Sequence, residues 1–222
     1  MNNSVTNTAR LLGAGLRALL VLTLVTGVLY PLVVTGIAQG LFPDKANGSE
    51  AEADGGVVGS SLIGQAYNLP LKKGEETPAP DPKWFQGRPQ NGLGTNSVNT
   101  RYKLILSGAT NRSGDDEELI QWVKDAKAAV VEDNSTGTYK VEPSDVPADA
   151  VTSSGSGLDP NISPQYADIQ VHRVAEKNGL SAGRVQKLVD EHIEGRTLGF
   201  MGEPRVNVLE LNIALKELVA KS

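Results

Sequence analysis

The stretch from Pro147 to Pro164 holds the residues best suited to chemistry. It reads PADAVTSSGSGLDPNISP and contains no lysine or arginine. Backbone amides exposed between glycines such as Gly155 and Gly157 can bind an anion such as phosphate. The same residues can also make a tight turn, because glycine adopts positive φ and Asp159-Pro160 favours a turn. Composition alone favours the turn, with the anion site as the alternative.

Three serines of this stretch, Ser153, Ser154 and Ser156, are candidate nucleophiles. A nucleophilic serine needs a base within hydrogen-bonding reach, and an esterase-type elbow has the pattern GxSxG. That pattern is absent around these serines, and the sequence assigns neither His172 nor His192 to them. A serine hydrolase is therefore the weaker interpretation.

Other catalytic signatures are missing from the chain. It lacks the phosphate-cradling GxxxxGK[ST] pattern and the Asp-Lys-Thr-Gly sequence of P-type pumps. His172 and His192 do not have HExxH spacing, and there are no cysteines. We expect no catalytic residue and no metal site in this chain, and structural roles for both histidines.

The clearest structural feature of the sequence is a run without charged residues between Arg17 and Asp44, rich in Leu, Val, Thr and Gly. A bilayer core about 30 Å thick needs roughly 20 apolar residues in a helix. A cleaved secretory signal has a shorter apolar core of about 7 to 15 residues. We therefore predict one transmembrane helix at residues 11–36, after a cytoplasmic tail at 1–10.

The span contains a Tyr30-Pro31 step and four glycines, Gly13, Gly15, Gly27 and Gly36. A neighbouring helix can satisfy a carbonyl freed by proline, and glycines allow close helix approach. Membrane helices also carry more glycine and proline than soluble helices do. A packed partner span and this general enrichment are equally good explanations.

Charges flanking the span set its orientation. Arg10 and Arg17 precede it, whereas Lys45 follows it among Asp44, Glu50, Glu52 and Asp54. Because positive residues favour the cytoplasmic side, we expect residues 37–222 outside the cytoplasm. The formal net charge of −5 and the lack of a basic stripe argue against a nucleic-acid partner.

Periodicity predicts a single α+β domain after the span, with a helical C-terminal third. A strand region is expected at 55–67, an insertion at 72–82 and an irregular surface at 87–99. Four helices are expected: 115–132, one capped by Ser163 that stops at Asn178-Gly179, one from Ser181 to Gly195, and one capped by Asn207 that runs to the end.

The sequence resembles the C subunit of the Kdp potassium-transporting ATPase. The matching segments occur in order along the chain: Tyr30-Pro-Leu, Thr35-Gly-Ile-Ala-Gln, Phe42-Pro, Ala46-Asn-Gly-Ser, GSSLIGQ from Gly59, Gly87-Arg-Pro, Ser107-Gly-Ala-Thr-Asn, VTSSGSGLDPNISP, Arg173-Val-Ala, Glu194-Gly-Arg and LGFMGEPRVNVLELNIAL from Leu198. It departs from the family in the 72–82 insertion and at Ala109, where glycine is expected.

The resemblance implies an accessory subunit of a P-type potassium uptake complex in the bacterial plasma membrane. In that complex an A subunit carries K⁺, a B subunit hydrolyses ATP and an F subunit stabilises the assembly. The C subunit is described as a catalytic chaperone that raises the ATP affinity of the B subunit, with no hydrolysis of its own. The rival function is a membrane-anchored extracytoplasmic serine hydrolase.

The resemblance also implies nucleotide-binding residues, since the family's Ser/Gly segment is likened to an ABC signature. Its nearest match here is Ser154, Gly155, Ser156 and Gly157. The charge bias places these residues outside, away from cytoplasmic ATP. We therefore favour an effect on ATP affinity that passes through subunit contacts as a coupling free energy. The domain is expected to dock over the ion entrance of the A subunit.

Overall fold

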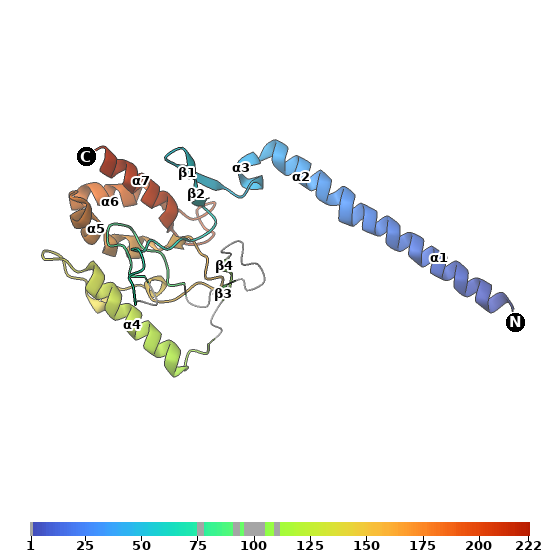
Figure 1. Cartoon of the computed structure of the whole chain (residues 1–222), viewed down its shortest axis with the longest axis horizontal. Helices are drawn as coiled ribbons and strands as arrows, with labels where there is room; N and C mark the ends of the chain where they lie inside the picture. The colour runs from blue at the N-terminus through green and yellow to red at the C-terminus, as the bar shows by residue number, and fades with distance from the viewer. Residues whose placement is uncertain (1, 75–77, 91–93, 96–104, 109–111) are drawn as a thin grey trace. The chain divides into compact units, whose positions relative to one another are not determined.

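The computed structural model describes most of the chain, and its residues form two compact units, 1–50 and 51–222 (Figure 1). The described residues are 2–74, 78–90, 94–95, 105–108 and 112–222. Parts of the expected 72–82 insertion and of the 87–99 surface lie outside these ranges, as does Ala109.

The first unit is dominated by one long helical segment. It consists of α1 (Asn2–Leu24), a π-helical turn η1 (Val25–Leu29) and α2 (Tyr30–Leu41). The stretch Ser4–Leu41 is long and apolar enough to cross a membrane, and its apolar side chains are exposed within the unit. A short helix, α3 (Pro43–Ala46), follows.

The π-turn accommodates Pro31 inside the helix. Proline lacks an N–H, and its ring collides with the carbonyl four residues earlier in a regular α-helix. Here the Tyr30 N–H bonds to the Val25 carbonyl, five residues back. The wider π-turn leaves space for the proline ring, and the hydrogen bonds around it are made within the same helix. This arrangement lessens the need for a neighbouring span at the Tyr30-Pro31 step.

The second unit combines short strands with helices, as the α+β prediction requires. Its strands are β1 (Glu50–Ala53), β2 (Gly56–Ser60), β3 (Gly94–Thr95), β4 (Ile105–Leu106), β5 (Asn161–Ile162), β6 (Ile193–Glu194) and β7 (Arg205–Asn207). They form the pairs β1–β2 and β3–β4 and the antiparallel sheet β5–β7–β6. The helices are α4 (Glu117–Asn134), α5 (Pro164–Asn178), α6 (Ala182–Glu191) and α7 (Val208–Ala220), with 3-10 turns at Pro143–Asp145 and Ala148–Ala150.

The helix starts follow the capping residues read from the sequence. Ser163 accepts the Tyr166 N–H at 3.1 Å, and Ser181 accepts the Arg184 N–H at 3.4 Å. Asn207 caps α7, and Gly179 ends α5 with a φ of 66°. Asp116 caps α4 by accepting the Leu119 N–H, an interaction that lowers its pKa. The predicted caps Ser163, Ser181 and Asn207 and the predicted stop at Gly179 are confirmed, whereas the cap at Asp116 was not predicted.

Two predicted boundaries are wrong. Helix α6 ends at Glu191 rather than at Gly195, because Ile193 and Glu194 form β6 and pair with β7. Ile193, which falls inside the helix expected from Ser181 to Gly195, is 37% exposed. The strand expected over 55–67 covers only Gly56–Ser60. Hairpin pairing overrides the helical pattern in the first case, and a turn after Ser60 ends the strand in the second.

Two buried amides pin a non-regular segment to the helical core. Asn212 of α7 accepts the Phe85 N–H at 3.0 Å and donates to the Phe85 carbonyl at 2.9 Å. Gln170 of α5 pairs with both backbone groups of Gln86 in the same way, at 2.7 and 3.1 Å. These side chains replace the strand partner that the segment lacks, which places Phe85 fully inside the core.

Candidate functional site

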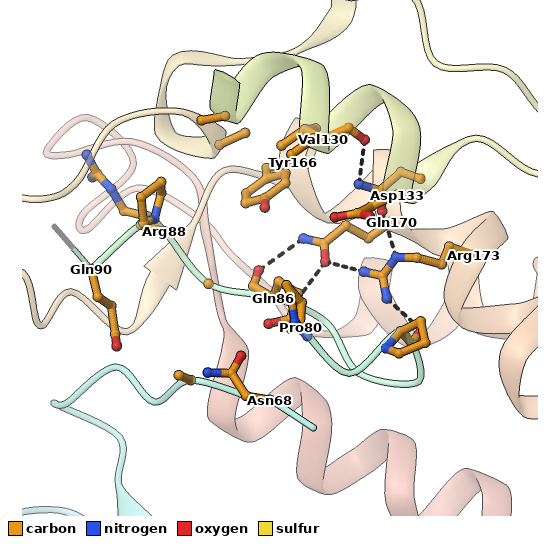
Figure 2. A pocket seen from close by; sticks show the side chains of 18 of the residues that line it. Asn68, Pro80, Gln86, Arg88, Gln90, Val130, Asp133, Tyr166, Gln170 and Arg173 are labelled. Atoms are coloured by element: carbon orange, nitrogen blue, oxygen red, sulfur yellow. Dashed lines mark hydrogen bonds between the residues drawn. The ribbon is translucent and has the colours of Figure 1, made fainter. Parts of the chain in front are cut away.

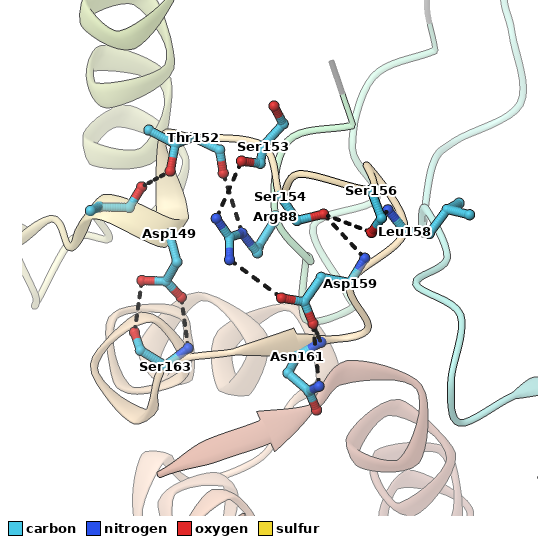
Figure 3. A network of polar contacts seen from close by, with 11 residues as sticks. Arg88, Asp149, Thr152, Ser153, Ser154, Ser156, Leu158, Asp159, Asn161 and Ser163 are labelled. Carbon is cyan, nitrogen blue, oxygen red and sulfur yellow. Dashed lines mark hydrogen bonds and ion pairs between the residues drawn. The ribbon is translucent and has the colours of Figure 1, made fainter. Parts of the chain in front are cut away.

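The Ser/Gly loop, residues 151–160, is a tight turn between a 3-10 turn and β5 (Figure 3). Gly157 has a φ of 69°, and its N–H bonds to the Ser154 carbonyl at 3.1 Å. A side chain at this φ would be strained, so glycine is strongly favoured there. Gly155 is exposed, does not have positive φ and has open space around its Cα.

The serine hydroxyls stabilise the loop from within. Ser156 Oγ accepts the Leu158 N–H at 3.1 Å, and Ser154 Oγ accepts the Asp159 N–H at 3.3 Å. The two hydroxyl oxygens lie 3.3 Å apart. The amides of Gly157, Leu158 and Asp159 therefore donate inside the loop, and a phosphate bound by these three would have to displace those bonds.

Arg88 braces the loop from a distant part of the chain. Its guanidinium donates to the carbonyls of Thr152 and Ser153 and to Asp159 Oδ2, each at 3.3 Å (Figure 3). The Arg88 and Asp159 side chains are 24% and 31% exposed, so their ion pair is partly shielded from water. One side chain thus joins both ends of the turn.

Two further segments bind the loop carbonyls. The Ser107 hydroxyl and the Gly108 N–H both donate to the Ser156 carbonyl, at 2.9 and 3.0 Å. The Gly64 N–H donates to the Leu158 carbonyl at 2.8 Å. A Cβ on Gly64 would lie 2.6 Å from the Asp159 carbonyl oxygen, so the two backbones approach too closely for any other residue.

Carboxylates complete the frame on either side. Asp149 accepts both the Ser163 N–H at 2.6 Å and the Ser163 hydroxyl at 2.9 Å. Asp159 Oδ1 accepts the backbone and side-chain N–H groups of Asn161, at 2.9 and 3.2 Å. These bonds couple the loop to the start of α5 and to β5. The Ser/Gly loop is therefore a junction of several segments that are far apart in sequence.

A cavity of about 360 Å³ lies beside this junction, between α4, α5 and the segments at 65–68 and 80–90 (Figure 2). Its inner wall is a polar network. Arg173 donates to Asn134 Oδ1 and Gln170 Oε1, each at 2.8 Å, and to the carbonyls of Pro82 and Trp84. Proline, alanine and valine side chains supply much of the remaining wall.

Burial shifts the ionisation of three groups at this cavity. It raises the pKa of Tyr166 to about 12, with the nearby Arg173 charge acting in the opposite direction. It lowers the pKa of the Arg173 guanidinium and raises that of the half-buried Asp133 carboxyl, which Arg173 partly offsets. Arg173 is 4% exposed, and all three of its side-chain nitrogens donate hydrogen bonds. This arrangement is typical of a buried charge with a structural role.

The histidines lie in structural settings. His172 of α5 stacks on Tyr139 with ring centroids 4.0 Å apart. His192 caps α6, with its Nδ1 at 2.8 Å from the Leu188 carbonyl. In the described part of the chain, the bonds of Ser154 and Ser156 run to backbone amides and to each other, with no histidine among their partners. For Ser154 and Ser156, this geometry does not assemble a nucleophile with a histidine base.

Metal ligands do not gather anywhere in the described ranges, where no group of three His, Cys, Asp or Glu residues could hold an ion. The predicted residues Ser154, Gly155, Ser156 and Gly157 are consecutive in one turn, in which the two serine hydroxyls contact each other and the Gly157 N–H bonds to the Ser154 carbonyl. Sequence reasoning missed Arg88 and Gly64 as the partners of that loop. Both fall in segments that carried the family resemblance, and this was the only signal available for them.

Comparison with known proteins identifies the family. The family model described as K+-transporting ATPase, c chain (KdpC) matches residues 12–217. A protein of Streptomyces avermitilis named Potassium-transporting ATPase KdpC subunit is 82% identical, over 100% of both chains. Proteins with the same name are 79% identical in Streptomyces coelicolor, over 99% of this chain and 98% of the relative, and 44% identical in Caldanaerobacter subterraneus subsp. tengcongensis, over 91% and 92%. The chain belongs to the KdpC family, the c chain of K⁺-transporting ATPases.

Proposed function

We propose that this chain supports assembly of an ATP-driven potassium uptake complex and raises the ATP affinity of its ATP-hydrolysing subunit, without hydrolysing ATP itself. The observation that carries the proposal is the extent of the family match. It covers residues 12–217, so the candidate membrane helix and the α+β domain belong to one subunit. Family membership favours this role over the serine hydrolase.

The proposed arrangement is a single-pass subunit of the bacterial plasma membrane. Residues 1–10 are cytoplasmic, 11–36 cross the membrane and 37–222 lie outside, in contact with the A, B and F subunits. Arg10 and Arg17 on one side of the span, against an acidic 44–54 segment on the other, support this orientation.

An indirect effect on ATP affinity fits this arrangement. Ser154, Gly155, Ser156 and Gly157 are the residues that would touch ATP in a direct mechanism. The Ser154 hydroxyl and the Gly157 amide are already engaged in holding the turn. We therefore propose that the domain acts through contacts with its partner subunits, as a coupling free energy between separate sites.

Docking over the ion entrance of the A subunit would add a modest electrostatic effect. The chain carries a formal net charge of −5, and a negative surface near an entrance enriches cations locally. Neutralising exposed carboxylates of the domain should then weaken K⁺ affinity of the assembled pump at low ionic strength. Unchanged K⁺ affinity would remove this steering effect and leave the docking proposal intact.

The test is a single cysteine at Gly155 in this cysteine-free chain, probed with a membrane-impermeant maleimide in intact cells. Gly155 suits this because the side chain would enter open space. A cysteine at Val5, which is 74% exposed, serves as the control for the opposite side. Labelling at residue 155 without labelling at residue 5 is expected, and the reverse pattern would place the loop in the cytoplasm.

The same variant separates direct from indirect coupling. After a bulky maleimide is attached at residue 155, the purified complex should hydrolyse ATP with an unchanged KM for ATP. A large rise in KM would mean that the loop contacts nucleotide. A complex purified without this chain provides the reference, and its KM for ATP should be higher than that of the whole complex.

A further inference from the structure

The β6–β7 hairpin, residues 193–207, exposes apolar side chains in its tip, the connection at 195–204. Leu198 is 79% exposed, Phe200 70% and Met201 49%. Single exposed apolar residues are ordinary on a protein surface, but a cluster of them in one turn points to a contact site.

The hairpin holds this tip in a defined shape. Thr197 and Met201 exchange both backbone hydrogen bonds, at 2.9 and 3.0 Å. The Phe200 N–H also donates to the Thr197 carbonyl at 3.3 Å. The tip is therefore organised before any partner binds, which lowers the entropy cost of association.

Backbone strain at Leu198 points the same way. Its φ is 54°, in the left-handed region that leucine seldom adopts, and Gly199 beside it has a φ of 81°. A non-glycine residue there is disfavoured, and glycine would relieve the strain. Strained positions of this kind concentrate at functional contacts, where the strain serves to aim a side chain.

The charges around the tip define the chemistry of the partner. Arg196 pairs with Glu203 at 2.8 Å, and Arg205 pairs with Glu194 at 2.7 Å. The base of the hairpin is therefore electrically balanced. A loop that binds anionic lipid headgroups carries an excess of lysine and arginine, which this one lacks. An apolar centre with a paired polar rim is the anatomy of a protein–protein contact.

We propose that the tip of the β6–β7 hairpin inserts Leu198 and Phe200 into an apolar, uncharged pocket of another subunit of the potassium-transporting ATPase. This inference rests on the proposed function, because it takes the partner to be a subunit of the complex. It adds the residues that make the contact. Loss of a single buried aromatic anchor should weaken the association roughly tenfold to hundredfold.

The test places the photo-crosslinking residue p-benzoyl-phenylalanine at position 200 of the full chain, in cells that express the whole complex. The matched control carries it at Ile120 of α4, which is 39% exposed. A crosslink to another subunit from position 200, and none from position 120, is expected. Crosslinks to lipid or to a second copy of this chain would overturn the proposal, as would no crosslink from a chain that still co-purifies.

A second variant, Phe200→Ser, measures how much the anchor contributes. It should fold normally, since the side chain is exposed, and should be lost from the purified complex on washing roughly tenfold to hundredfold more readily. Retention equal to that of the unchanged chain would contradict the proposal. If the unchanged chain itself fails to co-purify, both the proposed function and this inference fail. If the unchanged chain co-purifies and the variant is retained equally well, only this inference fails.

Discussion

The Ser/Gly loop and the β6–β7 hairpin treat their side chains in opposite ways. In the loop, Ser154, Ser156 and Asp159 turn their polar groups inward and bond to the backbone of the same turn. In the hairpin, Leu198 and Phe200 turn apolar groups outward into solvent. The residue types of the loop suggest a binding or catalytic site, yet its side chains stabilise the turn. The apolar residues of the hairpin suggest a buried core, yet they are exposed and available to a partner.

This difference shows that residue type alone does not separate a site from a scaffold. A serine is a nucleophile or a phosphate ligand only when its hydroxyl is free to act, and here two hydroxyls accept backbone amides. A leucine is a core residue only when something covers it. Substitutions in the loop should therefore change folding stability, and substitutions in the hairpin should change association.

The largest expected effect is that of Gly64→Ala at the loop. The new methyl group would lie 2.6 Å from a backbone oxygen of Asp159, which cannot rotate away. We expect a loss of about 2–3 kcal/mol in the free energy of unfolding. Urea titration of the detergent-solubilised chain measures this through Trp84 and Trp122, the two tryptophans of the sequence.

Gly155→Ala in the same loop is its matched control, because a methyl group there meets nothing within 4 Å. Its effect should stay within about 0.5 kcal/mol. Equal losses for the two variants would contradict the close approach at Gly64.

Arg88→Met should have the next largest effect. It keeps about the length of the apolar stem but removes the guanidinium, and with it the ion pair with Asp159 and the bonds to the Thr152 and Ser153 carbonyls. Since the group is partly exposed, we expect a loss of about 1–2 kcal/mol in the same urea titration.

Arg88→Lys tests the geometry, since lysine keeps the charge but not the planar fork. It should recover less than half of the lost stability. Full recovery would mean that the positive charge alone stabilises the loop, and that the three hydrogen bonds of the guanidinium do not.

Leu198→Gly should act in the opposite direction at the hairpin. Glycine relieves the strain at a φ of 54° but adds freedom to the unfolded chain. The isolated chain should gain up to about 1 kcal/mol in stability, while its retention in the complex falls. Equilibrium unfolding measures the gain in stability, and co-purification from the same preparation measures the loss of retention in the complex.

Leu62→Gly supplies the comparison, because Leu62 is 62% exposed but does not have positive φ. That variant should lose about 0.5–1 kcal/mol, as glycine does at an ordinary position. A stability loss for Leu198→Gly as well would remove the argument from strain.

The smallest effect concerns Asp133, a polar group of the cavity. Burial raises the pKa of its carboxyl above the ordinary 3.8, with Arg173 and Glu132 as lesser influences. The folded state therefore holds the proton more tightly than the unfolded state. This contribution to stability is present below pH 3.8 and is lost as the pH rises through the folded pKa.

Asp133→Asn should accordingly be slightly more stable than the unchanged chain at pH 7 and should lose this part of the pH dependence. Urea midpoints measured from pH 4 to pH 7 provide the comparison. A less stable variant at pH 7 would mean that attraction to Arg173 outweighs the cost of burial, and would make Asp133 a stabilising group like those of the loop.

Much of the helical framework could be predicted from the sequence, because its signals are local. Ser163 and Gly179 bound α5 as their capping preferences require. The end of α6 could not be predicted, since Ile193 continues the helical stripe but pairs with Val206 of β7. The pairing of β6 with β7, the two strands of one hairpin, leaves no periodic trace in the sequence of either strand.

The candidate site divides in the same way. The turn at Gly155 and Gly157 could be read from composition, but Arg88 lies more than sixty positions from Thr152 and Ser153, whose carbonyls it holds. Nothing in the local sequence of Arg88 marks that role. The exposure of Leu198 could not be predicted from the sequence either, because an apolar residue close to a strand is ordinarily buried.

The π-turn at Val25–Leu29 has a consequence for the direction in which the long helix faces its surroundings. An inserted residue shifts the azimuth of every later side chain by about 100° from its place in an unbroken α-helix. A line of residues drawn along α1 at helical spacing therefore emerges on a different face of α2. If this candidate membrane helix is inserted as proposed, a cysteine scan of lipid accessibility along α1 and α2 should show two regular waves with a phase jump between Val25 and Leu29. The two halves of the helix would then face different neighbours.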